Sequence, residues 1–312
     1  MDQGTYHEVD HPLVAGVKVM PGSLAGQERP KAGFEYISPS QIKSYKYCAG
    51  QYWLKYGLFL EEKQTSSLVR GSALHAGQHA FFAALKTGDA NIDPVDAAIA
   101  AAREYLRTHP IDVYSPRYQK GAADTPESLD EDMVLGVTTL VDHWWKLKVH
   151  ATEQGYVIFW RDPNVLPVLG YCDIITDAAT PDERAAVDLK TSVKSKSARD
   201  VEFDVALAIY AAGHELLTGI RTRESKYLMY CFTKERKALW VDGPALGGPA
   251  DLTRVFTIAK GLTLARSHGI YLAIPDPMVC KSCSLIVDCD RVNGKIGIAD
   301  RTALPLEIEE AA

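Results

Sequence analysis

Two apolar segments that each carry an aspartate constrain this chain more than any other feature. They span residues 169–176 and 185–190, and a connection containing Pro181 joins them. Short apolar runs separated by a turn predict two neighbouring strands. Asp173 lies in the first run and Asp188 in the second. Because a buried carboxylate is costly unless it is paired or binds a metal, these two positions are candidates for chemistry.

Lys190 completes a candidate reactive group with these aspartates. Residues i and i+2 of a strand point to the same face, so Asp188 and Lys190 project together and Asp173 can meet them from the neighbouring strand. Such a set suits metal-assisted phosphodiester hydrolysis. The carboxylates would hold Mg²⁺ or Mn²⁺, the metal would activate a water, and the ammonium would orient that water or stabilise charge on the phosphate. The alternative is a structural ion pair at a strand end.

A basic stretch follows the second predicted strand. Between Lys190 and Arg199 the chain carries Lys194 and Lys196 and no acidic residue. Such a stretch is either a phosphate-binding loop or an ordinary solvated loop, and both interpretations stay open at this point.

The remaining pattern predicts a mixed α/β chain. Helix caps and apolar periodicity predict helices from Ser38 onward and over residues 68–85, 94–108, 126–150, 203–217 and 251–268. Apolar runs predict strands over residues 156–160, 165–176, 185–191, 227–232 and 238–241, and an irregular segment from Leu285. We expect four segments in one compact domain: an extended arm (1–32), a helical part (33–150), an α/β core (151–245) and a C-terminal part with an acidic tail (246–312).

The helix expected at residues 68–85 carries two further candidates. Gly71 weakens a helix, which favours a close backbone approach at that point. His75 follows one turn later. A single helical histidine is commonly structural, but a neutral imidazole is also a metal ligand.

Four of the six cysteines form a distinctive pattern. Cys48 stands alone near the start, and Cys280, Cys283 and Cys289 follow each other closely near the end. Four thiolates suit a [4Fe–4S] cluster or a tetrahedral Zn²⁺. Zinc sites more commonly use two Cys-x2-Cys pairs, and the third alternative is four free thiols. A site of this kind would join the two ends of the chain, as a crosslink that closes a long loop does.

The sequence pattern and composition indicate in which cellular compartment the chain is expected. No apolar run approaches the roughly 20 residues that span a bilayer, and the N-terminus lacks a signal-peptide pattern. We therefore expect no membrane contact and a cytoplasmic location, which for a phage protein means the host cytoplasm. There metal binding by cysteines is favoured over disulfides. The net charge of −6 argues against a broadly basic nucleic-acid surface.

Taken together, these features resemble the iron–sulfur branch of the PD-(D/E)XK nuclease superfamily. The resemblance is to RecB-type exonuclease domains, including those of AddB and the CRISPR-associated nucleases, and it covers most of the chain. Four features carry it in order: Ser38-Pro39-Ser40 leading to Cys48, Arg70-Gly71-x3-His75, Gly170-x2-Asp173 with Asp188-Leu189-Lys190, and the cysteine trio.

The resemblance implies roles and a fold. His75, Asp173, Asp188 and the Leu189 carbonyl would bind the metal, and Lys190 would be the catalytic lysine. The four cysteines would hold a structural [4Fe–4S] cluster. Tyr210 matches a tyrosine of the family and is a candidate substrate contact, and Lys194 and Lys196 of the basic stretch are the other two. The implied fold is a mixed central sheet flanked by helices, with a helical insertion after His75 and an iron–sulfur staple between the N- and C-terminal parts.

Two functions follow as expectations. The first is a metal-dependent DNA exonuclease acting on single strands or DNA ends, in recombination, repair or phage DNA processing. The second is a catalytically weak DNA-binding subunit of a recombination or CRISPR-adaptation complex, since Ala206 stands where the family has glutamine four residues before Tyr210. The absence of a Gly-x4-Gly-Lys-Ser/Thr motif argues against a nucleotide-driven motor in this chain.

Overall fold

The computed structural model describes residues 5–20, 36–115, 123–180, 182–192, 194–232, 236–271, 280 and 283–292. These residues divide into two compact units, which are described separately. The larger unit comprises Met1–Pro39 and Lys63–Lys260, and the smaller comprises Ser40–Glu62 and Gly261–Ala312. This division differs from the four segments expected from the sequence, whose boundaries stay a prediction.

The larger unit is built on one seven-stranded sheet whose strands lie side by side in chain order. All neighbouring strands run antiparallel except β5 and β6, which are parallel. The strands are β1 (Thr5–Glu8), β2 (Val14–Met20), β3 (Val149–Trp160), β4 (Val168–Asp177), β5 (Arg184–Ser192), β6 (Thr222–Cys231) and β7 (Lys237–Gly243). A mixed sheet flanked by helices was expected, and this part of the prediction is confirmed.

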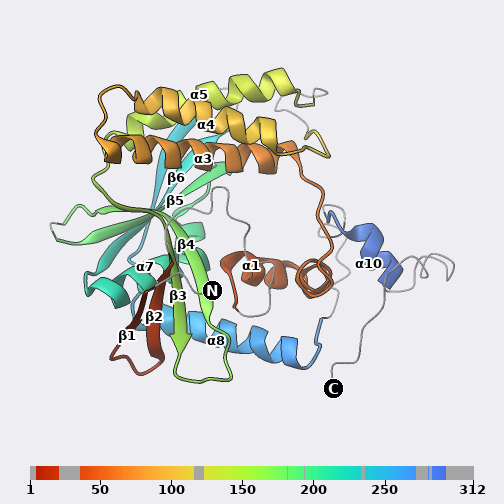
Figure 1. Cartoon of the computed structure of the whole chain (residues 1–312). Coiled ribbons are helices and arrows are strands. Elements are labelled where there is room, and N and C mark those ends of the chain that lie inside the picture. Colours follow the sequence, from red (N-terminus) through yellow and green to blue (C-terminus); the bar gives the residue numbers. More distant parts are fainter. Residues whose placement is uncertain are drawn as a thin grey trace. The chain divides into compact units, whose positions relative to one another are not determined.

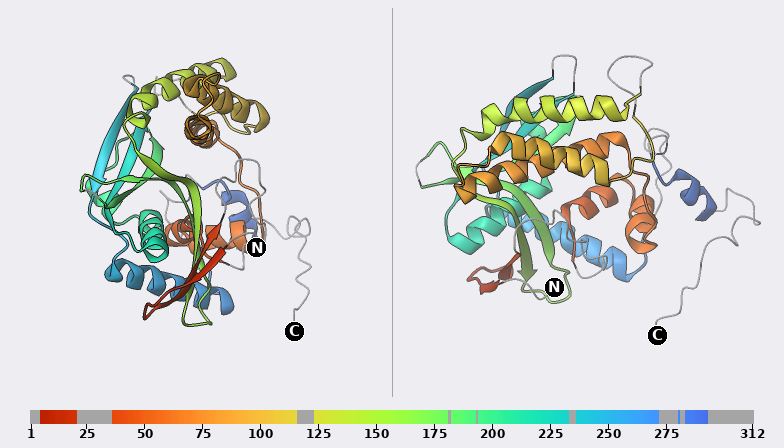
Figure 2. Two further views of the ribbon diagram at one scale, coloured as in Figure 1. Left: turned by 60° about the vertical axis from the view of Figure 1, so that its left-hand side comes forward. Right: turned by 45° about the horizontal axis from the view of Figure 1, so that its top comes forward.

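Three helices form a layer on the β5–β6 part of the sheet (Figures 1 and 2). They are α3 (Ser66–Thr87), α4 (Pro94–Thr108) and α5 (Pro126–Trp144). Their buried residues share one apolar core with Leu189 of β5 and with Leu228 and Tyr230 of β6. Asp93 and Thr125 cap the second and third of these helices through their side chains, as the Asp-Pro and Thr-Pro pairs predict.

The helix α7 (Val205–Thr218) covers the opposite face of β5 and β6 (Figure 1). Tyr227 precedes Leu228 on β6, so it points away from the three-helix layer, and its hydroxyl reaches Asp204 at the start of α7. Ten consecutive residues from Val205 to His214 are buried, which explains why this helix is apolar all round. A short helix, α6 (Ala198–Glu202), comes just before it.

Several helices and strands differ in extent from those expected from the sequence. Residues 5–8 and 14–20 lie in the sheet as β1 and β2, whereas an extended or loosely packed arm was expected. The helix expected to reach residue 150 ends at Trp144, and β3 begins at Val149 although its first residues are polar. These polar residues of β3 pair with β4, so pairing with a neighbouring strand outweighs their weak local preference for strand structure.

The smaller unit combines two distant stretches of the chain. It holds most of α1 (Pro39–Tyr47), then α2 (Ala49–Tyr52), the π-helix η1 (Trp53–Gly57), the end of α8 (Pro249–Ser267) and α10 (Ile286–Val292). The last of these is helical where an irregular segment was expected. Arg266 joins the two stretches because its guanidinium donates to the Tyr52 hydroxyl and, at 2.6 Å, to the Gln41 side chain. The Trp53 ring stacks on Tyr271 at 4.4 Å.

No helix in the described part of the chain is both long and apolar enough to cross a membrane.

Candidate metal and catalytic site

The two predicted aspartates lie where β4 and β5 separate. Ladder pairing between these strands extends from Asp177–Arg184 to Ile174–Val187, and Asp173 and Asp188 are the next residues beyond the last pair. Past this point β4 stays paired with β3, and β5 stays paired with β6. The sheet therefore forks at the two carboxylates. The backbone N–H of Leu189 donates to Asp173 Oδ2 at 2.7 Å and bridges the fork.

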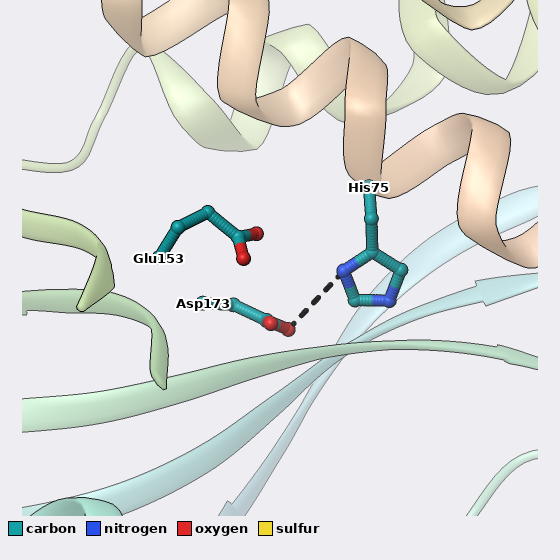
Figure 3. A group of neighbouring side chains, drawn as sticks. All are labelled: His75, Glu153 and Asp173. Carbon is teal, nitrogen blue, oxygen red and sulfur yellow. Dashed lines mark ion pairs between the residues drawn. The ribbon is translucent and has the colours of Figure 1, made fainter. Parts of the chain in front are cut away.

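His75 reaches this fork from α3. Its Nδ1 lies 3.4 Å from Asp173 Oδ2 (Figure 3). Burial opposes protonation of the imidazole, but the charge of Asp173 and the hydrogen bond to it outweigh burial and raise the pKa of His75 to about 9. Burial alone would raise the pKa of Asp173, yet His75, Lys190 and the Leu189 N–H together lower it below its ordinary value. Asp173 is thus held ionised although it is buried.

Gly71 explains how α3 comes close enough to place His75. A Cβ at this position would lie 2.8 Å from Thr191 Oγ1 of β5, closer than such contacts normally are. The close backbone approach predicted at Gly71 is therefore confirmed. The neighbouring Arg70 is buried and anchors the same helix, with Nη1 3.0 Å from Asp132 of α5 and 3.5 Å from Asp124.

Lys190 and Asp188 form an ion pair on the far side of the fork. The Lys190 ammonium also lies 5.6 Å from the centre of the Tyr227 ring. Burial lowers the pKa of Lys190, but the charges of Asp188, Asp204 and Asp173 outweigh burial and raise it above its ordinary value. The lysine is therefore a permanent cation beside the carboxylates.

Asp204 belongs to this environment although it is distant in sequence. It caps α7, since its Oδ1 accepts a 2.6 Å hydrogen bond from the Ala206 N–H, and its Oδ2 accepts from the Tyr227 hydroxyl. Its charge raises the pKa of Lys190. Ala206 is buried in the first turn of the same helix.

Glu153 is a site residue that sequence reasoning missed. The register of β3 and β4 pairs Thr152 with Ile174 and Gln154 with Cys172, which sets Glu153 opposite Asp173. One ligand atom from each of His75, Glu153 and Asp173 lies within 4.8 Å of the others (Figure 3). Glu153 also has a φ of 50°, a backbone conformation that is uncommon outside glycine.

Opposed carboxylates repel each other across a strand pair, so this geometry favours a cation between them. A possible acidic and histidine metal site therefore exists here. Sequence alone offered no signal for Glu153, because the residue lies in a polar segment and its position depends on strand register.

Three residues were expected to contact substrate: Tyr210, Lys194 and Lys196. Tyr210 is buried on α7, with its ring edge 2.8 Å from the position that a Cβ on Gly170 would take. Burial raises its pKa, and the charges of Asp188 and Asp173 add to this effect. Lys194 and Lys196 lie exposed between β5 and α6. Contact of these three residues with substrate stays a prediction.

The four cysteines of interest all belong to the smaller unit. Burial raises the pKa of the Cys283 thiol, and the charges of Cys289, Cys48 and Cys280 raise it further. Among the residues that the structure describes, no three cysteine sulfurs lie within 4.8 Å of one another, so an assembled iron–sulfur staple is not shown.

A solved structure shares this architecture. The crystal structure of a candidate exonuclease from Eubacterium rectale is similar to this chain with a TM-score of 0.53 at 15% sequence identity, over 91% of this chain and 99% of that one. A likeness at this identity supports the fold alone. The structure named SSO0001 matches less well, with a TM-score of 0.30 at 13% identity over 80% of this chain and 93% of that one. No curated protein gives a significant match.

A comparison with protein-family models assigns the chain to a family. The model of the PD-(D/E)XK nuclease superfamily matches residues 36–290, which include the fork, His75 and all four cysteines of the smaller unit. The chain belongs to the PD-(D/E)XK nuclease superfamily.

Proposed function

We propose that this chain is a metal-dependent deoxyribonuclease that acts as an exonuclease on single strands or DNA ends. The observation that carries the proposal is the fork between β4 and β5, where Asp173 and Asp188 meet His75 on one side and Lys190 on the other. Family membership supports hydrolysis of a nucleic acid. Preference for DNA and for ends, and a place in recombination, repair or phage DNA processing, are part of the proposal.

The donor set at the fork fits a hard divalent cation. Carboxylate oxygens suit Mg²⁺ and Mn²⁺, and imidazole adds a ligand acceptable to Mn²⁺. His75, Glu153, Asp173, Asp188 and the Leu189 carbonyl would hold the ion. When bound, such an ion lowers the pKa of a coordinated water and polarises the phosphate. Because a protonated imidazole is no ligand, the cation would have to displace the proton that Asp173 holds on His75.

Lys190 would act on the substrate directly. Its ammonium is oriented by Asp188 and lies over the face of Tyr227. From there it would donate a hydrogen bond to a phosphate oxygen or to the attacking water and stabilise charge that develops in the transition state. Burial beside three carboxylates keeps this charge in place without rearrangement during the reaction.

We further propose the iron–sulfur subtype, with Cys48, Cys280, Cys283 and Cys289 holding a [4Fe–4S] cluster. All four cysteines belong to the smaller unit, which supports a common metal site, and zinc is the alternative occupant. Anaerobic purification followed by iron, zinc and acid-labile sulfide analysis tests this. Stoichiometric zinc without sulfide would contradict it.

The proposed activity is tested on end-labelled single- and double-stranded DNA with Mg²⁺ or Mn²⁺. Wild type should degrade the labelled strand, and Asp173→Ala should abolish cleavage. Asp130→Ala is the matched control, because this aspartate lies partly exposed on α5 in an ion pair with Arg103. If Asp173→Ala retained wild-type cleavage, the assignment of the site would be wrong.

A second candidate is a nuclease-like DNA-binding subunit of a recombination or CRISPR-adaptation complex. Ala206 favours it, because the glutamine that the family places there is lost. This function predicts DNA binding without cleavage at every Mg²⁺ and Mn²⁺ concentration. Cleavage by wild type that Asp173→Ala abolishes would exclude it.

A further inference from the structure

We propose that Phe203 and Arg199 form a platform on which an unpaired base stacks as a single strand enters the Lys190 site. The proposal rests on the proposed function of that site and adds the part of the substrate that the protein would recognise, an unpaired base. It names single-stranded nucleic acid, whose bases have free faces, as the ligand.

Phe203 is one of the exposed aromatic residues of the larger unit. About half of the residue, 53%, is accessible, although Val201 and Val205 on either side of it in the chain are buried. The central carbon of the Arg199 guanidinium lies 5.7 Å from the centre of its ring. An exposed aromatic ring beside a guanidinium offers both a stacking face and a cation for the adjoining phosphate.

The platform is held rigidly. Ser197 and Asp200 cap α6 reciprocally through their side chains. Val201 in the middle of this helix is fully buried and packs against Gly243 of β7, where a Cβ would lie 2.2 Å from it. The Glu202 carbonyl accepts a hydrogen bond of 3.3 Å from Arg254. Because both ends and the middle of α6 are fixed, Phe203 would bind a base without first having to be ordered.

Tyr227 connects the platform to the candidate lysine. Its ring lies under the Lys190 ammonium, and its hydroxyl donates to the Asp204 carboxylate and, at 3.2 Å, to the Asp200 carbonyl. Phe203 directly precedes Asp204 in the chain. A strand whose phosphate reaches Lys190 would therefore pass close to the Phe203 ring.

The charges around Phe203 match a phosphate backbone. Lys194 and Lys196 lie exposed in the segment between β5 and α6, and the Arg199 guanidinium lies over the Phe203 ring. Of the acids nearby, Asp200 is engaged as the cap partner of Ser197, and Asp204 caps α7 and accepts from Tyr227. Glu202 is the remaining acid of this segment, and it lies exposed on α6. Asp200 and Glu202 are the acids of this segment that lie exposed, so the three cations outnumber them by one.

Stacking on Phe203 requires a base that is free of its partner, which distinguishes a single strand or a frayed end from an intact duplex. The test is equilibrium binding of a fluorescent oligothymidine in EDTA, where no cleavage occurs. Phe203→Ala should weaken binding about five- to tenfold, the lower part of the range for aromatic stacking. Phe203→Trp should bind as wild type does, and Phe203→Leu, which keeps apolar area without a π face, should resemble Phe203→Ala.

The matched control is Leu135→Ala, which removes another exposed apolar side chain, on α5. A second arm replaces single nucleotides of the oligomer by abasic residues. One position should weaken wild-type binding and have no effect on Phe203→Ala. If Phe203→Ala bound as tightly as wild type, or if both proteins responded equally to every abasic position, the platform would be refuted.

The two proposals fail in distinguishable ways. Cleavage that requires Asp173 together with unchanged binding by Phe203→Ala would refute the platform and leave the nuclease intact. Position-specific abasic sensitivity that is lost in Phe203→Ala, in a protein that never cleaves, would support the platform and refute the nuclease.

Discussion

At the scale of single residues, Asp204 connects the start of α7 to the candidate lysine. Asp204→Asn keeps an oxygen for the helix cap but removes the charge beside Lys190. The cleavage rate should therefore fall about ten- to hundredfold, as when a group that orients a reactive residue is lost, while the melting temperature stays unchanged. Asp204→Ala should also lose ~1 kcal/mol of stability with the cap.

Single-turnover rates and thermal melts measure these two effects separately. Asp200→Asn is the control, because Asp200 also caps a helix in this region and its side chain engages Ser197. A wild-type rate for Asp204→Asn would show that the charge at this position does not position Lys190.

His214 should make stability depend on pH. It is buried on α7, with Nδ1 3.3 Å from the Tyr156 hydroxyl, and burial, with Arg184 and His150, lowers its pKa to about 4. An unfolded histidine binds a proton near pH 6.5, so unfolding takes up a proton between about 6.5 and 4. Stability should fall across this window by up to ~3 kcal/mol as the pH decreases.

Urea unfolding at about pH 7 and about pH 4.5 measures this loss of stability. His214→Gln should reduce it, whereas His7→Gln, at an exposed position of β1, should leave it unchanged. Equal pH dependence in wild type and His214→Gln would contradict the prediction.

Glu153 marks the limit of what residue patterns reveal about the site. Asp173, Asp188, Lys190 and His75 could be predicted because each stands in a recognisable local pattern. Glu153 stands in a polar stretch and joins them because the β3–β4 register sets it opposite Asp173. Register is a property of paired strands, so a single strand read alone does not contain it.

At the scale of elements, the contact between α3 and β5 should be sensitive to a single methyl group. Gly71→Ala should raise helix propensity by up to about 1 kcal/mol, and the new Cβ would meet Thr191. The helix then shifts, and with it His75. We expect stability to change by less than about 1 kcal/mol but cleavage to fall by tenfold or more, since misplacement by about 1 Å costs up to 10²-fold.

The double variant Gly71→Ala/Thr191→Ala removes the clash and should recover most of the activity. Gly261→Ala is the control, because this helical glycine in α8 has nothing within 4 Å of the added Cβ. If Gly71→Ala were fully active, the close approach would have no part in placing His75.

Elements with strong local signals were predicted well, and those that depend on pairing were not. The Asp93 and Thr125 caps located the starts of α4 and α5, and the apolar runs located β4 and β5. The strand β1 is exposed at all four positions and lies in the sheet through its ladder with β2. A strand of this kind has no hydrophobic alternation from which to predict it.

At the scale of the whole molecule, the smaller unit brings together segments from both ends of the chain. The spacing of the cysteines predicted such a connection, and the structure places all four in this unit. Between Cys48 and Cys280 lie more than two hundred residues, which form most of the sheet and its helices. A cluster bound by these cysteines would close that loop in the unfolded chain as well and so reduce its entropy.

Cys283→Ala should therefore destabilise the whole protein more than it alters the chemistry. Loss of a ligand that opens the cluster would remove a loop-closure contribution of roughly 5 kcal/mol at most. The melting temperature should fall strongly, iron content should drop, and the folded fraction should cleave at nearly the wild-type rate, because the fork residues belong to the larger unit. Ser284→Ala, an exposed neighbour in the same unit, should leave all three quantities unchanged. A Cys283→Ala protein that melts like wild type would refute the structural role of the cysteines, whatever metal they bind.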